Sequence, residues 1–157
     1  MGIHDLVGDA EVTNRGVYFI EGTYRVLQVE QIFEMVSQND DDLVIIECAI
    51  LQSDVKDRPA GSRVSQVYNF RYKSTPGNVR AMLAAVFAVP VEEITPEVSM
   101  LACSQEQPCA GRLVRVEAKL GETRAGNPFT FVSWKPLRDD MQLQAAELRE
   151  AAGFEPL

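Results

Sequence analysis

Three consecutive β-rich segments constrain the fold of this 157-residue chain more than any other feature. They are residues 22–37, 43–53 and 62–73. The first and third alternate apolar and polar side chains, which is the period of a strand with one buried face. The second is apolar at nearly every position, which is typical of a central strand or one covered on both faces. Three such segments in a row predict an antiparallel meander.

After the third segment the hydrophobic period becomes that of a helix. Apolar residues recur at the i, i+3, i+4 spacing of one helix face, at Val79, Met82, Leu83, Val86 and Phe87. Asn78 is the expected N-cap and Pro90 the expected end. A second, short helix is predicted with Thr95 as its cap and Pro96 at its first position.

Two more strands and a last helix complete the chain. Residues 112–120 and 128–135 are predicted strands joined by a hairpin loop at 121–127. Asp139 or Asp140 is expected to cap a C-terminal helix. That helix carries a narrow apolar stripe of Met141, Ala145, Leu148 and Ala152.

This order predicts a mostly β fold with helices. Five antiparallel strands with a helix between the third and fourth form the plan of the OB-fold, a partly open barrel that binds oligonucleotides. An α+β sandwich of another topology is the alternative. The expected organisation is an N-terminal arm at 1–21, the OB-fold domain at 22–138, and a C-terminal helix with a short acidic-hydrophobic tip at 139–157.

Composition points to a soluble protein of the cytoplasm. The apolar runs are shorter than the about 20 residues that span a bilayer, and the amino terminus lacks the features of a signal peptide. Three cysteines without a paired framework are typical of a reducing compartment. We therefore expect no membrane partner.

The charge distribution is more informative than the net charge of −8, which by itself disfavours a nucleic-acid ligand. Residues 1–55 carry two basic and eleven acidic groups, whereas 56–80 carry six basic groups and one acidic group. Residues 111–138 again hold six basic groups, against two acidic ones. Twelve of the fifteen basic residues thus lie in two blocks, which form a nucleic-acid surface if the fold brings them together.

Residue types suited to catalysis are scarce. The single histidine, His4, lies in the N-terminal arm, and Cys48 lies in the most apolar strand. Cys103 and Cys109 lack the second ligand pair of a zinc site. The acidic run 40–42 lacks calcium-loop spacing, and the chain has neither phosphate-binding nor dinucleotide-binding glycine motifs. We expect no enzyme, no metal and no cofactor.

Binding of a single-stranded nucleic acid requires basic groups along its phosphate backbone and aromatic faces on which its bases stack. The expected phosphate contacts are Arg63, Arg71, Lys73, Arg80, Arg112, Arg115, Lys119 and Arg124. The expected stacking residues are Tyr68, Tyr72, Phe129 and Phe131. Tyr68 and Tyr72 are expected on one face of the third strand together with Phe70, whereas Trp134 is expected in the core. The alternative for each aromatic residue is a place inside the barrel.

The chain resembles a family of bacteriophage and prophage single-stranded DNA-binding proteins with an OB-fold. The similar segments are 16–19, 22–24, 61–65, 77–80, 126–129 and 134–136. The resemblance implies an accessory protein of DNA replication or recombination that coats single strands without sequence preference. It also implies replication or recombination proteins as partners and the cytoplasm of a bacterial host cell as the location. The long acidic tail of such proteins is missing here.

Two other functions remain open from the sequence. One is an OB-fold adaptor or inhibitor that binds a protein and whose acidic surface excludes or mimics DNA. The other is an enzyme that acts on nucleic acid through the acidic run 40–42 and a metal. The choice between DNA and RNA is also open, because no motif indicates contacts to the 2′-hydroxyl. Exposed strand edges and an amphipathic C-terminal helix make a homodimer reasonable.

Overall fold

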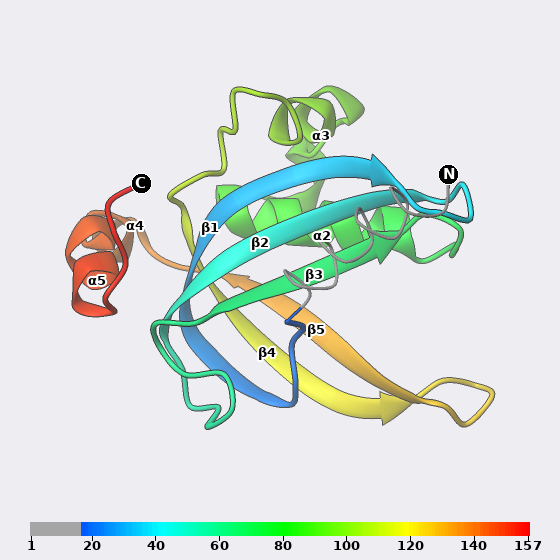
Figure 1. The fold of residues 1–157 in the computed structure, drawn as a ribbon. Helices are drawn as coiled ribbons and strands as arrows, with labels where there is room; N and C mark the ends of the chain where they lie inside the picture. Colours follow the sequence, from blue (N-terminus) through cyan, green and yellow to red (C-terminus); the bar gives the residue numbers. More distant parts are fainter. Residues whose placement is uncertain (1–16) are drawn as a thin grey trace.

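The computed structural model describes residues 17–157, and its main feature is one sheet of five antiparallel strands (Figure 1). The strands are β1 (Gly22–Val36), β2 (Asp42–Gln52), β3 (Arg63–Asn69), β4 (Leu113–Glu122) and β5 (Pro128–Pro136). They are ordered β3-β2-β1-β4-β5 across the sheet. The predicted meander and the predicted hairpin therefore meet at β1. The prediction of a mostly β chain with five antiparallel strands and helices is confirmed.

Strand β1 belongs to both halves of the sheet. It pairs with β2 along residues 26–36 and with β4 along residues 22–28. Register shifts interrupt both ladders, and Glu30 is the extra residue between the paired positions Val29 and Gln31. Because a bulge bends its strand and increases the local twist, these shifts let β1 curve and turn the two halves of the sheet toward each other (Figure 1).

The two outer strands, β3 and β5, do not pair, so the sheet is not closed. Side chains fill the space between them. The indole Nε1 of Trp134 donates a hydrogen bond of 2.7 Å to the hydroxyl oxygen of Tyr68. The ring of Phe19 packs edge-on against Trp134 and against Tyr24, with centroids 5.6 and 4.9 Å apart. Phe19 is buried, so the last residues of the predicted N-terminal arm contribute to the core.

Helix α2 (Thr75–Phe87) packs against β5 and β3 and supplies the apolar side chains predicted for it. Its expected N-cap, Asn78, is wrong. The helix begins four residues earlier than predicted, at Thr75, with Ser74 at the cap position and Pro76 in the first turn. Proline suits that turn because its fixed φ is helical and its missing N–H has no helical partner there.

Two short elements follow α2, the 3₁₀ turn η1 (Val91–Glu93) and helix α3 (Pro96–Ala102). The predicted cap of α3 is confirmed, because Thr95 Oγ1 accepts a hydrogen bond of 3.3 Å from the Val98 N–H. Ile94 and Ala102 are buried in the main core and anchor the two ends of this segment. Helix α3 lies at the upper edge of the molecule in Figure 1.

The C-terminal segment forms two short helices, α4 (Asp139–Gln142) and α5 (Ala145–Ala151), instead of the single helix predicted. The break lets the Gln142 side-chain amide donate to and accept from the backbone of Leu113, both at 2.8 Å. The predicted apolar stripe packs on a second, smaller core. That core consists of Val26, Ala49, Leu51 and Leu113.

The stripe is therefore covered within the chain, which removes it as an argument for a homodimer. Among residues 17–157, no helix has both the length and the apolar character needed to cross a membrane.

Candidate nucleic-acid interface

The clearest grouping of predicted site residues lies on the hairpin of β4 and β5. The two strands pair in register from Val114 opposite Pro136 to Glu122 opposite Pro128. The chain reverses at residues 123–127, where the Thr123 N–H donates to the Asn127 carbonyl at 2.9 Å. The end of this hairpin projects from the body of the molecule (Figure 1), so its side chains meet solvent.

The register places aromatic and basic side chains on one face of the hairpin. Lys119 lies opposite Phe131, and Arg115 lies opposite Lys135. Side chains directly opposite each other in an antiparallel pair share a face. Phe129 is on this face as well, because it stands two residues before Phe131. We call this surface the ribbon face, defined as Arg115, Glu117, Lys119, Phe129, Phe131 and Lys135, together with Arg124 of the adjoining loop.

The two phenylalanines of the ribbon face are exposed although they are large and apolar. Phe129 is 47% exposed and Phe131 is 51% exposed. Their rings meet edge to face, with centroids 4.7 Å apart and planes 77° apart. The Phe131 ring also lies over Gly121, where a Cβ atom would come within 2.4 Å of it. The missing side chain of Gly121 therefore lets the Phe131 ring approach the backbone of the hairpin.

Most cations of the ribbon face are free of carboxylates. Within residues 17–157, Lys119, Arg124 and Lys135 form no ion pair. Arg115 has a carboxylate oxygen of Glu117 at 3.5 Å, and both side chains are about two-fifths exposed. Exposed pairs of this kind hold their partners weakly. These cations are therefore available to an anionic ligand.

Lys135 was not among the expected phosphate contacts. The alternation of β5 was a sufficient signal, because positions 129, 131, 133 and 135 fall on one face of a strand. Its partner across the ladder, Arg115, was on the expected list. Two cations thus stand side by side at the base of the ribbon face.

A second group of predicted residues lies in the turn after β3. The prediction that residues 62–73 form one strand is wrong, because β3 ends at Asn69. The Asn69 side-chain oxygen accepts a hydrogen bond of 2.9 Å from the Arg71 N–H. This local bond turns the chain in the way that asparagine commonly does.

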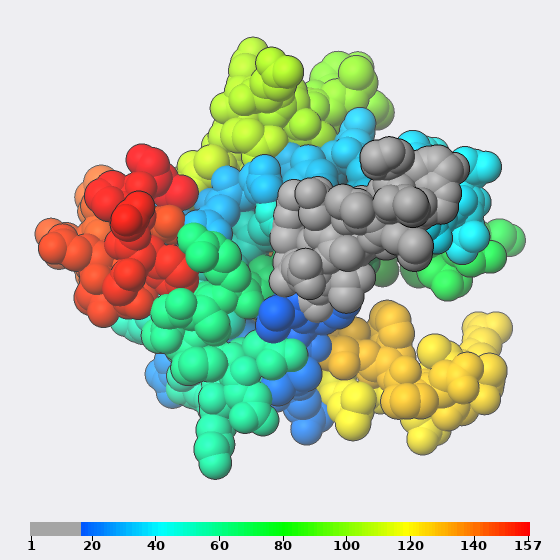
Figure 2. All heavy atoms as spheres, viewed as in Figure 1, coloured from blue at the N-terminus to red at the C-terminus, as the bar shows by residue number. Residues whose placement is uncertain are grey.

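Arg71, Tyr72 and Lys73 are exposed on this turn. The Arg71 guanidinium lies 5.7 Å from the centre of the Tyr72 ring and 3.7 Å from a carboxylate oxygen of Asp41. In Figure 1 the turn lies at the same end of the molecule as the hairpin tip, and Figure 2 shows a notch between the two. The structure thus brings parts of both basic blocks to one end.

The expectation that Tyr68 stacks on bases is wrong. Its side chain is 7% exposed and packs in the main core, where its hydroxyl accepts the hydrogen bond from Trp134. Burial raises the pKa of the Tyr68 phenol. Trp134 packs against the same core, as predicted. Tyr68, Phe70 and Tyr72 do not share a strand face, because β3 ends before the last two.

Three of the predicted arginines are engaged elsewhere. Arg63 pairs with Glu30 at 2.6 Å, at the other end of β3 from the turn. The Nε atoms of Arg80 and Arg112 each donate at 3.1 Å to a backbone carbonyl, of Ile94 and Val86 respectively. These three arginines do not belong to the ribbon face.

Thiol and metal chemistry find little support in the described residues. Cys48 and Cys109 are buried and Cys103 is partly buried. Burial raises the pKa of Cys103 to about 11 and that of Cys109 to about 12, which keeps both thiols protonated at neutral pH. No group of three or more His, Cys, Asp or Glu side chains in residues 17–157 is arranged to hold a metal ion. His4 lies outside the described residues.

Comparison of the sequence with the models of known protein families gives no match, and comparison with curated proteins gives none either.

Proposed function

We propose that this chain is an OB-fold protein that binds single-stranded DNA on the ribbon face without sequence preference. The observation that carries the proposal is the exposed pair Phe129 and Phe131 with Lys119 directly across the ladder. Exposed aromatic rings next to free cations are what a flexible, unpaired strand requires. Such binding suits an accessory protein of DNA replication or recombination.

The aromatic and the basic side chains would make different contacts with the DNA. The rings of Phe129 and Phe131 each offer a stacking surface, and stacking on one aromatic side chain contributes about 1–3 kcal/mol. Lys119, Arg124 and Lys135 would neutralise phosphates and release counterions. Neither interaction depends on base identity, so this surface supports binding without sequence preference.

The OB-fold interpretation predicts the path of the bound DNA strand across the protein. In that fold the loops between strands one and two and between strands four and five flank the ligand groove. Here those loops are residues 37–41 and 123–127, and the basic turn at 71–73 lies at the same end of the molecule (Figure 1). We propose that the bound DNA strand runs from the ribbon face across the notch toward Tyr72. The acidic side chains of Asp40 and Asp42 at the far rim would disfavour a duplex.

Fluorescence anisotropy with labelled oligo-dT, oligo-U and a matched duplex tests the proposal. Four phosphate contacts, one for each ribbon cation, predict that affinity for oligo-dT falls about 50-fold between about 50 and 200 mM salt. The duplex is expected to bind more weakly. Absence of oligo-dT binding at the lower salt concentration would overturn the proposal, and tighter binding of oligo-U would reassign the ligand to RNA.

Substitutions then locate the site. Phe129→Ala with Phe131→Ala should weaken oligo-dT binding by about 1–3 kcal/mol for each ring. Leu143→Ala removes an even more exposed apolar side chain from the segment between α4 and α5 and serves as the control. Equal losses in the two variants would show that the phenylalanines are not the binding surface.

A further inference from the structure

A groove lined by apolar side chains runs along the side of the molecule that carries α3. Two hollows adjoin there and share Phe70 and Ser99 as lining residues. One is lined by the β1–β2 hairpin, including Met35 and Leu43. The other lies between α2 and α3, with Leu83 and Ile94 in its wall. We call this surface the α3 groove.

The α3 groove has an acidic rim beside the β1–β2 hairpin, is lined by Arg80 between α2 and α3, and retains exposed apolar surface. Glu34 and Asp42 line it, and both are exposed. Val36 is 58% exposed and Phe70 is 38% exposed. Exposed apolar surface rimmed by polar groups marks an interaction site.

Two exposed surfaces of this chain are therefore complementary. The ribbon face presents Phe129 and Phe131 among cations, whereas the α3 groove presents an apolar floor among Glu34 and Asp42. We propose that the ribbon face of one copy docks in the α3 groove of a second copy. The phenylalanines would enter the groove, and Lys119 and Arg124 would face its carboxylates.

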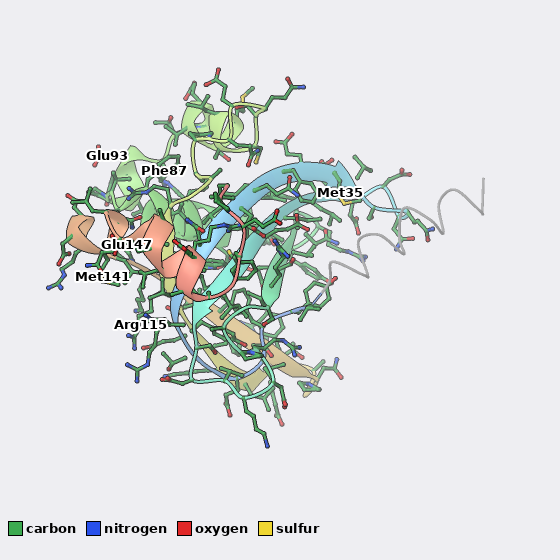
Figure 3. All side chains as sticks on the ribbon, turned by 60° about the vertical axis from the view of Figure 1, so that its left-hand side comes forward. Met35, Phe87, Glu93, Arg115, Met141 and Glu147 are labelled. Carbon is green, nitrogen blue, oxygen red and sulfur yellow. The ribbon has the colours of Figure 1, made fainter. Side chains whose placement is uncertain are left out.

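This contact joins different surfaces of the two copies. In Figure 3, Arg115 at the base of the ribbon face lies low in the view, whereas Met35 of the α3 groove lies near its upper side. A contact between two different surfaces leaves one of each free at the ends of the pair and can add further copies. The contact is small, so we expect reversible, concentration-dependent association and not a permanent dimer.

Sedimentation velocity over about a hundredfold range of protein concentration at low salt measures the association. The sedimentation coefficient of the wild-type chain should rise with concentration, and high salt should abolish the rise. A ribbon variant, Phe129→Ala with Phe131→Ala, should remain monomeric. A groove variant, Glu34→Lys with Asp42→Lys, should remain monomeric as well. Persistent association of either variant overturns the proposal.

A matched control separates the groove from a general charge effect. Glu147→Lys with Glu150→Lys makes the same change in net charge on α5, away from the groove. This control should associate like the wild-type chain. Circular dichroism of all variants should show unchanged secondary structure, since every substituted side chain is exposed.

Mixing the two deficient variants is the decisive test. The ribbon variant keeps an intact groove and the groove variant keeps an intact ribbon face, so one productive contact remains between them. The mixture should form heterodimers and nothing larger. A mixture that stays monomeric, or one that forms long assemblies, contradicts a head-to-tail contact.

Competition with DNA rests on the proposed function, whereas the association itself does not. Phe129 and Phe131 cannot stack on bases and fill the groove together, so oligo-dT should dissociate wild-type assemblies. The groove variant should still bind oligo-dT, and its added positive charge near the basic turn at 71–73 should not weaken that binding. If oligo-dT binds while the wild-type chain stays monomeric throughout, the association fails and the proposed function stands. If the chain associates and oligo-dT does not bind, the reverse holds.

Discussion

Two regions of this molecule use arginine and lysine in opposite ways. On the ribbon face, Lys119 and Lys135 form no ion pair within residues 17–157. At the C-terminal end, Arg63 and Arg149 both bind Glu30, at 2.6 and 2.9 Å. The difference shows that a basic residue indicates a ligand surface only when the fold has not already given it a carboxylate.

The C-terminal cluster is built around the bulge in β1. Glu30 is the extra residue of that bulge and accepts hydrogen bonds from both arginines. The Phe154 ring lies 5.0 Å from the guanidinium of Arg63 and 5.1 Å from that of Arg149. The acidic-hydrophobic tip of the chain is therefore held against the sheet. This placement differs from the long, free acidic tail of single-strand binding proteins.

Removing Arg149 should have the largest effect of the changes considered. Its side chain is 6% exposed and also donates to Gln28 Oε1 at 3.0 Å, so Arg149→Ala removes one of the two arginine partners of Glu30 and the donor to Gln28 Oε1. Breaking a buried pair in this way costs about 3–5 kcal/mol. Urea denaturation should show this loss, whereas oligo-dT affinity measured on the folded protein should be unchanged.

Arg138→Ala is the control for this prediction. Arg138 also forms an ion pair, with Asp140 at 3.3 Å, but both side chains are largely exposed. Its loss should change the free energy of unfolding by less than about 1 kcal/mol. Comparable losses in the two variants would contradict the division between buried and exposed cations.

The aromatic residues also divide into a buried group and an exposed group. Tyr68→Phe tests the buried group. The substitution removes the hydroxyl that accepts the 2.7 Å hydrogen bond from Trp134 and keeps the ring. We expect the free energy of unfolding to fall by about 1 kcal/mol. Oligo-dT affinity should not change, since Tyr68 is buried. A reduced oligo-dT affinity with an unchanged free energy of unfolding would indicate that Tyr68 contacts DNA.

Lys119→Gln tests the unpaired cations of the ribbon face, and its expected effect on oligo-dT binding is smaller. Loss of one phosphate contact to a single strand should reduce the slope of log affinity against log salt by about 0.7. Arg63→Gln removes the same charge from a side chain paired with Glu30, and the slope should then stay unchanged. Anisotropy titrations at several salt concentrations measure both slopes. The opposite pattern would place the DNA surface at the C-terminal end.

Local patterns in the sequence predicted most of the elements and part of the candidate site. The alternation in β4 and β5 correctly separated the inward Val116 and Trp134 from the outward Lys119. It failed for β3, where a hydrogen bond from the Arg71 N–H to the Asn69 side chain ends the strand. Such a local turn competes with a strand period that the apolar residues alone would continue.

The partners of the arginines could not be predicted from the sequence. Glu30 is separated from Arg63 by 33 positions and from Arg149 by 119 positions. They meet only because a bulge turns Glu30 out of register and the C-terminal segment packs beside it. A count of charge by segment therefore assigned Arg63 to a phosphate surface. Sheet closure also depends on contacts distant in sequence, since Tyr68 and Trp134 are 66 positions apart.

The smallest expected effect is the pH dependence that Glu30 gives to the C-terminal cluster. Burial by itself would raise the pKa of this carboxyl, but hydrogen bonds from Arg63 and Arg149 outweigh it and lower the pKa below the usual value of 4.5. A carboxyl with a lowered pKa in the folded state stabilises that state above its unfolded pKa. The stabilisation is lost as the pH falls through the folded pKa.

Glu30→Gln removes this titration and nearly preserves the shape of the side chain. The difference in unfolding free energy between the wild-type chain and this variant should therefore be constant above about pH 5.5 and shrink as the pH falls below about 4.5. Urea denaturation at a series of pH values measures it. A difference that grows on acidification would mean that the two arginines do not stabilise the Glu30 carboxylate, and the contrast with the unpaired cations of the ribbon face would then fail.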